Sequence, residues 1–143
     1  MTVTTINSAD TGRQTSPRAM IWTGRIITTL AALFFLFDAV MKFVKPQPVV
    51  KGTMDLGYSE SVILPLGAVL LTCTILYLIP PTAVLGAILL TGYLGGAVAS
   101  HLRAGGGWFP VSFPIVFGVL TWLGLWLREP RLRELVFWRR PLK

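Results

Sequence analysis

The longest uncharged stretch of the sequence occupies residues 61–100, and it leaves few folds open to the chain. Pro80 and Pro81 divide it into two apolar segments, 61–79 and 82–100, of about 19 residues each. A helix needs ~20 apolar residues to cross the ~30 Å hydrocarbon core of a bilayer. A soluble helical hairpin of this length would carry a polar stripe along each helix, and neither segment has one. We therefore predict two membrane-spanning helices joined by a tight turn.

Two further apolar runs complete the pattern. The first, predicted as a span over residues 22–44, is interrupted by Asp38 and Lys42, and the last is predicted over residues 109–127. Charged residues make up 13% of the chain, about half their share in globular proteins. Because lipid leaves every backbone group to be satisfied within the chain, we expect the spans to be helices. The predicted fold class is all-α, an integral membrane four-helix bundle with short loops over residues 21–128.

The two ends of the chain differ in composition from the predicted bundle. Residues 1–20 are polar and rich in Thr and Ser, which predicts a flexible cytoplasmic tail. Residues 129–143 are basic and place Leu132, Leu135 and Val136 on one helical face, which predicts an amphipathic interfacial segment lying on the membrane. A solvated charged tail is the alternative interpretation of this last segment.

The distribution of basic residues predicts the orientation of the bundle. Four spans put both termini on one side, and most of the basic residues are on that side. They are Arg13, Arg18, Arg25, Arg128, Arg131, Arg133, Arg139, Arg140 and Lys143. Those on the opposite side are Lys42, Lys45, Lys51 and Arg103. Because cytoplasmic loops are enriched in Lys and Arg, we expect a multi-pass protein of the cell membrane with both termini cytoplasmic, whose basic residues face lipid rather than nucleic acid.

Asp38 and Lys42 are the clearest candidates for a functional site, because ionisable residues within a span are costly and need a partner. At 1.5 Å per residue, Asp38 lies about 18 Å beyond Ile26, deep in the hydrocarbon core. An aspartate at the centre of a span costs ~2.5–3.5 kcal/mol on insertion scales. Lys42 follows at i+4, on the same helix face and in the favourable orientation for an ion pair. The alternative is a local pair that eases insertion and has no further role.

A second group of polar residues is expected at the outer end of the bundle. His101 and Arg103 end the third span, Glu60 begins the second, Tyr58 precedes it, and Tyr93 lies about two turns before His101. Because the first and third spans run in the same direction, we predict one pocket that opens outward. Its candidate ligand-binding residues are Asp38, Lys42, Tyr58, Glu60, Tyr93, His101 and Arg103. The alternatives are interfacial snorkelling for His101 and Arg103 and core packing for Tyr93.

Such a pocket offers hydrogen-bond donors beside apolar walls, which suits the head group of a quinone. His101 adds a group that can carry protons near neutral pH. One cysteine, Cys73, and one histidine cannot build a structural zinc site or a paired-cysteine redox centre. A metal site made of Asp38, Glu60 and His101 has no specific spacing, so we expect no resident metal, and the sequence assigns no catalytic residue.

Small residues form a row in the third span. Gly92 and Gly96 are spaced i, i+4, and Ser100 continues the row. Small residues let helix backbones approach one another closely in lipid. We expect Gly92 and Gly96 to form a helix-packing surface, either within the bundle or against another chain.

Several segments resemble the DoxX-like family of small integral membrane proteins. They are residues 36–42 (LFDAVMK), 56–60 (LGYSE), 79–103 and 122–133. The segment 79–103 is the most specific, whereas Ser59 stands where the family pattern usually has proline, a departure that affects only a loop. The resemblance covers about residues 22–140 and implies a four-helix membrane bundle.

The resemblance also bears on function. The family takes its name from a small membrane subunit of a thiosulfate:quinone oxidoreductase, and relatives are linked to redox complexes and to the maturation of other proteins. We therefore expect a quinone-linked accessory or subunit of a membrane redox system, with a redox partner subunit or a homo-oligomer as its assembly. The alternatives are a non-catalytic, chaperone-like assembly partner of another membrane protein and a membrane enzyme acting on a lipophilic small molecule.

Overall fold

The structure, a computed structural model, describes residues 17–130 and 132. Within these residues the protein is all-α, as predicted, and contains no β-strand. The α-helices are α1 (Pro17–Val44), α2 (Gln47–Asp55), α3 (Ile63–Leu78), α4 (Ala83–Arg103) and α5 (Trp108–Arg128). Short 3₁₀ helices, η1 (Glu60–Val62) and η2 (Pro80–Thr82), precede α3 and α4. Most of the predicted tails, 1–20 and 129–143, lies outside the described residues.

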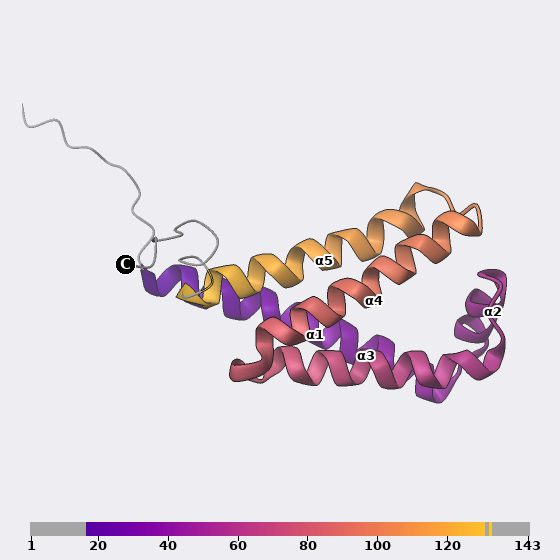
Figure 1. Cartoon of the computed structure of the whole chain (residues 1–143), viewed down its shortest axis with the longest axis horizontal. Coiled ribbons are helices and arrows are strands. Elements are labelled where there is room, and N and C mark those ends of the chain that lie inside the picture. The colour runs from indigo at the N-terminus through magenta and orange to yellow at the C-terminus, as the bar shows by residue number, and fades with distance from the viewer. Residues whose placement is uncertain (1–16, 131, 133–143) are drawn as a thin grey trace, which may run out of the picture.

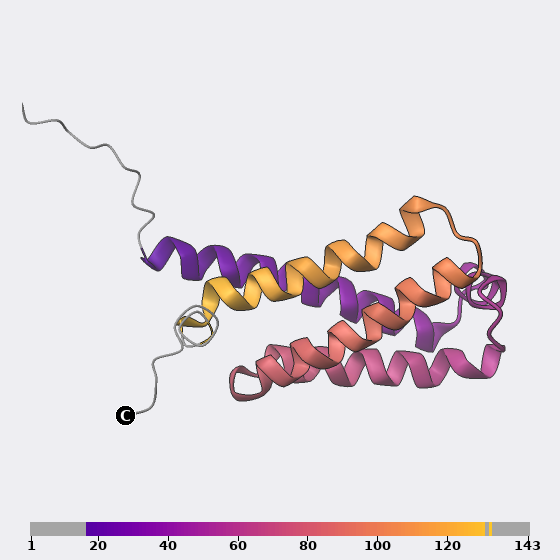
Figure 2. The same cartoon turned by 45° about the horizontal axis from the view of Figure 1, so that its top comes forward.

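Four helices of the described chain, α1, α3, α4 and α5, are long and apolar enough to cross a membrane. Helix α1 packs against α3 and α5, and α4 packs against the same two helices. In cross-section the four helices therefore form a square, with α1 and α4 on one diagonal and α3 and α5 on the other. Figures 1 and 2 show that the first turn of α1 and the last turn of α5 lie toward the same end of the bundle as η2.

The proline residues explain where two helices begin. Helix α1 starts at Pro17, before the predicted start of the span at residue 22, so residues 17–20 are helical and not part of a tail. Proline suits the first position of a helix because its φ is preset and its missing N–H would have no partner there. Ile79, which precedes Pro80, has the extended backbone that this position favours, and it ends α3.

The connection between α1 and α3 is not the short loop that the sequence predicts, because it contains α2. This helix has no buried residue and lies across the end of the bundle opposite η2 (Figure 1). It begins just after Lys45 and ends just before Gly57, and both residues have positive φ, of 52° and 83°. Nine residues that include Pro48 and Gly52 carry too weak a helix propensity to reveal it in the sequence.

The end of the bundle near η2, here called the closed end, is packed through glycines. A Cβ atom on Gly86 of α4 would meet the backbone of Tyr77 in α3. A Cβ atom on Gly124 of α5 would lie 2.7 Å from Thr28 Oγ1 in α1. Because these contacts involve backbone or a fully packed side chain, the two helix pairs touch as closely as their backbones permit.

Buried polar contacts complete the closed end. The side chain of Tyr77 is fully buried, and its hydroxyl donates to the Thr121 carbonyl at 2.9 Å. Arg128 donates to the Tyr77 carbonyl at 2.9 Å and lies over the Tyr77 ring at 5.2 Å. This carbonyl belongs to the last turn of α3, where no partner within the helix is available. Arg128 therefore ties the end of α5 to the end of α3.

Candidate functional site

A cavity of about 670 Å³ lies at the other end of the bundle, here called the open end, and is partly open to its surroundings. The volume falls within the ~300–1,000 Å³ typical of sites for small molecules. Helices α1, α2, α4 and α5 supply most of the lining, and α3 supplies Leu66. The cavity therefore occupies the diagonal between α1 and α4, beneath α2.

Aromatic side chains form much of the apolar wall. Phe34 of α1 stacks on Phe117 of α5 with ring centroids 4.0 Å apart, and Phe113 contacts both rings edge-on or tilted. Phe35 and Phe109 also line the cavity. Such walls offer flat, polarisable surfaces on which a planar ring can stack.

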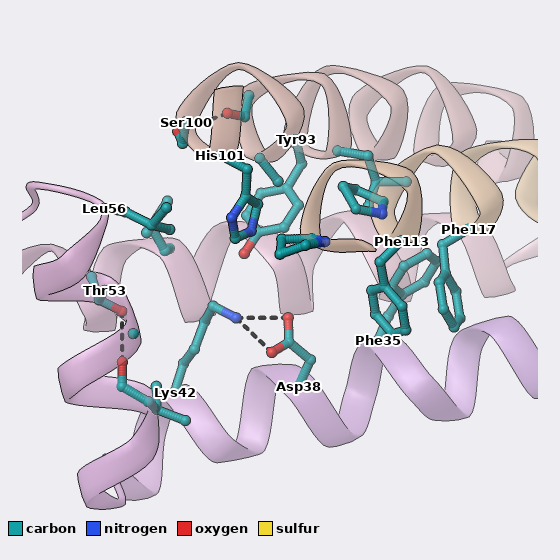
Figure 3. Close-up of a pocket in the computed structure, with 18 of the residues that line it drawn as sticks. Phe35, Asp38, Lys42, Thr53, Leu56, Tyr93, Ser100, His101, Phe113 and Phe117 are labelled. Atoms are coloured by element: carbon teal, nitrogen blue, oxygen red, sulfur yellow. Dashed lines mark hydrogen bonds and ion pairs between the residues drawn. The ribbon is translucent and has the colours of Figure 1, made fainter. Parts of the chain in front are cut away.

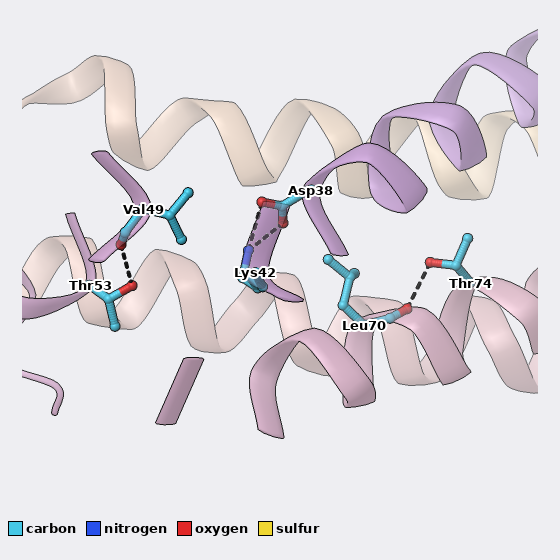
Figure 4. A network of polar contacts seen from close by, with 6 residues as sticks. All are labelled: Asp38, Lys42, Val49, Thr53, Leu70 and Thr74. Carbon is cyan, nitrogen blue, oxygen red and sulfur yellow. Dashed lines mark hydrogen bonds and ion pairs between the residues drawn. The ribbon is translucent and has the colours of Figure 1, made fainter. Parts of the chain in front are cut away.

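The charged pair predicted in the first span lines this cavity. Lys42 Nζ lies 2.6 Å from both carboxylate oxygens of Asp38 (Figures 3 and 4). The lysine stem crosses Gly67 of α3, where a Cβ atom would lie 2.9 Å from Lys42 Cβ. The Lys42 side chain is 15% exposed and that of Asp38 is 35% exposed. The carboxylate is therefore the more accessible member of the pair.

Helix α4 presents a second set of polar groups to the same cavity. His101 and Tyr93 point from α4 toward the Asp38–Lys42 pair of α1 (Figure 3). Within the described residues, neither the His101 imidazole nor the Tyr93 hydroxyl makes a hydrogen bond to the protein. Tyr58 also lines the cavity, and its hydroxyl lies 2.8 Å from Ser100 Oγ.

Two of the predicted site residues lie beside the cavity rather than in its wall. Glu60 pairs with Lys45 at 3.5 Å on the exposed surface. Arg103 donates to the Leu56 carbonyl at 2.8 Å, and its guanidinium lies 5.5 Å from the centre of the Tyr58 ring. These contacts join the segments flanking α2 to the rest of the bundle, so they position α2 over the cavity.

Gly92 and Gly96 line the cavity too, and a Cβ atom on either residue would have no atom of the described chain within 4 Å apart from the backbone of its own helix and its chain neighbours. The close approach between α4 and α3 occurs at Gly86 instead. Within the bundle, these two glycines therefore leave space next to the charged pair rather than bringing two helices together.

Several lining residues are not among those predicted from the sequence. The aromatic wall had a usable signal, because Phe34 and Phe35 precede Asp38 by four and three residues and so share its helix face. Phe113 and Phe117 are likewise spaced i, i+4 on α5. The lining residues of α2 had no such signal, since the helix itself was not predicted. They are Pro48, Val49, Gly52 and Thr53, with Leu56 just after the helix.

The residues of the cavity fit a lipophilic ligand with a small polar head. The phenylalanine rings suit an apolar or planar body, whereas Asp38, Tyr93 and His101 offer hydrogen bonds to polar atoms. In the part of the chain that the structure describes, no three His, Cys, Asp or Glu side chains gather as a metal site would require.

Comparison with known families agrees with this architecture. The model of the DoxX-like family matches residues 26–124, well over half of the chain. The chain belongs to the DoxX-like family. The matched region includes α3 and α4 in full, most of α1 and α5, and the lining residues from Phe34 to Phe117. No curated protein and no solved structure matches the sequence. Family membership and the apolar helices together make this DoxX-like chain a small multi-pass membrane protein, in contact with the lipid bilayer.

Proposed function

We propose that this DoxX-like protein binds a molecule of the quinone class in the cavity and serves a membrane redox system as a quinone-linked accessory or subunit. One observation carries the proposal: aromatic walls and a charged pair line the same cavity in the spans of a membrane protein. A quinone has a flat apolar ring with oxygen atoms on its edge and a long apolar tail. When bound, it supplies the capacity to take up or release electrons together with protons.

Each part of the lining has a task in this proposal. Phe34, Phe113 and Phe117 hold the faces of the ring by stacking. His101 and Tyr93 make hydrogen bonds to the oxygen atoms of the head group, because both side chains point into the cavity with their polar atoms uncommitted (Figure 3). The Asp38–Lys42 pair fixes the polar end of the cavity opposite them.

The direct test is to purify the protein in native-lipid particles, extract it with organic solvent and quantify quinone per protein chain. We expect close to one quinone per wild-type chain. Gly92→Leu fills the cavity and should lower the bound quinone more than tenfold. Gly95→Leu is the matched control, because Gly95 lies on the outer groove between α4 and α5 and has the same free space around it.

A second arm tests the polar contacts. His101→Ala should lower the affinity for added short-tailed quinone about tenfold, the loss expected when one hydrogen bond of ~1–1.5 kcal/mol disappears. Leu102→Ala is the control, because its side chain is 61% exposed and does not line the cavity. Absence of quinone from the wild-type sample, together with no binding of added quinone, would refute the proposal.

The same variants distinguish the assembly role named as an alternative. A protein that holds a partner through the α4 glycines should lose that partner on Gly92→Leu and keep it on His101→Ala. A quinone-linked protein should bind its ligand more weakly after both changes. Co-purification followed by mass spectrometry, run alongside the quinone assay, separates these two outcomes.

We also infer that both termini face the cytoplasm and that the cavity lies toward the opposite surface. Basic residues support this orientation, since Arg18, Arg25 and Arg128 all lie at the end where α1 begins and α5 ends. In a Cys73→Ser background, an impermeant thiol reagent applied to intact cells should label Ser59→Cys and spare Ala19→Cys. The reverse labelling pattern would overturn the orientation.

A further inference from the structure

We infer that the cavity is built for a head group that donates hydrogen bonds, so that it holds the hydroxyl-bearing quinol form of a quinone in preference to the oxidised form. The inference rests on the proposed function and adds the redox form of the ligand to it. It follows from counting which hydrogen-bonding atoms of the lining are already used within the protein.

The carboxylate of Asp38 has spare capacity as an acceptor. An ionised carboxylate can accept about four hydrogen bonds. Lys42 donates one to each oxygen, which leaves a further lone pair on each of them. The Asp38 side chain is also more than twice as exposed as that of Lys42, at 35% against 15%. A ligand in the cavity therefore meets the acceptor of the pair more readily than its donor.

Three of the four hydroxyl groups in the lining already donate their proton within the protein. Thr53 donates to the Val49 carbonyl at 2.8 Å (Figure 4), and Ser100 donates to the Gly96 carbonyl at 2.8 Å. Because the single proton of Ser100 is committed, the bond of 2.8 Å between Ser100 and Tyr58 takes its proton from Tyr58. Toward the cavity, all three hydroxyls can therefore only accept.

The remaining polar side chains do not reverse this balance. Lys42 keeps one N–H after its two bonds to Asp38, which is fewer donors than the acceptors left on the carboxylate alone. His101 and Tyr93 can each donate or accept, so either redox form of a quinone can use them. Arg103, a pure donor, does not line the cavity and donates to the Leu56 carbonyl. The polar end of the cavity thus has more acceptors than donors.

The two forms of the ligand differ in this property. The ring oxygens of an oxidised quinone only accept hydrogen bonds, so they would face the carboxylate and the committed hydroxyls without a proton between them. The hydroxyls of a quinol donate, and a bond to a carboxylate is stronger than one between neutral groups. One such bond supports a preference of about 10-fold to 100-fold for the quinol, since each tenfold corresponds to ~1.4 kcal/mol.

The test compares three ligands on the wild-type protein in lipid nanodiscs, by equilibrium dialysis under anaerobic conditions. They are a short-tailed benzoquinol, the benzoquinone formed by its oxidation, and the dimethyl ether of the quinol, which keeps the ring but cannot donate. We expect the quinol to bind 10-fold to 100-fold more tightly than either of the others.

A variant tests the role of the carboxylate. Asp38→Asn adds a donor, removes the charge and releases Lys42, so the preference for quinol should fall below about threefold or invert. Asp55→Asn is the matched control on the exposed end of α2, outside the cavity, and should keep the full preference. Helix content and thermal unfolding of each variant establish that it is folded, and if Asp38→Asn does not fold, the three-ligand comparison on the wild type decides alone.

The outcomes separate this inference from the function on which it rests. If wild-type protein binds benzoquinone or the dimethyl ether as tightly as the quinol, the inference is wrong and the quinone-binding function stands. If Asp38→Asn folds and keeps the full preference, the carboxylate is not the acceptor that selects the quinol. If none of the three ligands binds folded protein, the proposed function itself fails.

Discussion

The closed end and the open end of the bundle are built from the same kinds of residue and differ in what those residues face. At the closed end, Gly86 and Gly124 lie against atoms of the neighbouring helix, and the Tyr77 hydroxyl is buried in hydrogen bonds. At the open end, Gly92 and Gly96 face free space, and the Tyr93 hydroxyl points into a cavity (Figure 3). One end holds the helices together and the other keeps them from closing over a site.

The difference shows how a small bundle can combine stability with an open cavity. Without water, the close packing of small residues is a main source of helix association in lipid, and the closed end supplies it. The open end carries groups that would destabilise a packed core, above all the charged pair. Each of the following predictions changes one end and uses the other end, or a neighbouring position, as its control.

The largest effect is expected from breaking the charged pair. Lys42→Met leaves the Asp38 carboxylate in the span without its partner, which should lower the free energy of unfolding by about 3–5 kcal/mol. The measurement is titration of purified protein with a denaturing detergent, followed by tryptophan fluorescence. Lys51→Met on exposed α2 should change stability by less than ~0.5 kcal/mol.

A double variant checks the cause of this loss. Asp38→Leu combined with Lys42→Met removes both charges, and the stability should return to within ~1–2 kcal/mol of wild type, since apolar residues often replace a buried pair at no cost. The double variant should nevertheless lose the preference for the quinol. If it is as unstable as Lys42→Met alone, the missing partner is not the cause of the instability.

Glycine-to-alanine changes should have opposite signs at the two ends. Gly86→Ala forces a methyl group against the Tyr77 backbone and should cost ~1–3 kcal/mol. Gly92→Ala meets no atom within 4 Å and should stabilise the helix by ~0.5–1 kcal/mol, because alanine loses less backbone entropy on folding. Thermal unfolding in detergent measures both. Equal effects at the two positions would contradict the comparison between the ends.

Removal of a hydroxyl group should matter more at the closed end. Tyr77→Phe removes the donor to the buried Thr121 carbonyl, at a cost of about 1 kcal/mol in the free energy of unfolding. Tyr58→Phe removes a partly exposed bond to Ser100 at the open end and should cost less than half as much. Detergent titration of both variants side by side makes the comparison, and a larger cost for Tyr58→Phe would reverse our assignment of which end carries stability.

The architecture could be predicted from the sequence because lipid permits few alternatives. Uncharged runs of about 20 residues with prolines between them predict four long apolar helices, and the described chain contains four helices long and apolar enough to cross a membrane. The same physics does not apply to α2, which lies outside the apolar runs and is held by contacts with distant residues, such as the Leu56 carbonyl with Arg103. The sequence therefore predicted a loop where the structure has a helix.

The site could be predicted in part. The pairing of Asp38 with Lys42 follows from their spacing on one helix, and the structure brings His101, Tyr93 and Tyr58 to the same cavity. The role of Gly92 does not follow from spacing. An i, i+4 pair of glycines can either pack closely against a neighbouring helix or line a cavity. Only the distance to the opposite helix decides between them, and that distance depends on the whole bundle.

The prediction most specific for the cavity, with only a small effect on stability, concerns α2 as its cover. Because α2 has no buried residue, its position depends on contacts such as those of Arg103 with the Leu56 carbonyl and the Tyr58 ring. Arg103→Ala should cost at most ~1 kcal/mol in stability, since both contacts are exposed. It should increase the rate of ligand dissociation several-fold, measured by displacement of bound quinol in a stopped-flow instrument. Arg25→Ala, which removes a similar contact with Trp22 near the start of α1, should leave that rate unchanged, and equal rates for the two variants would mean that α2 does not cover the cavity.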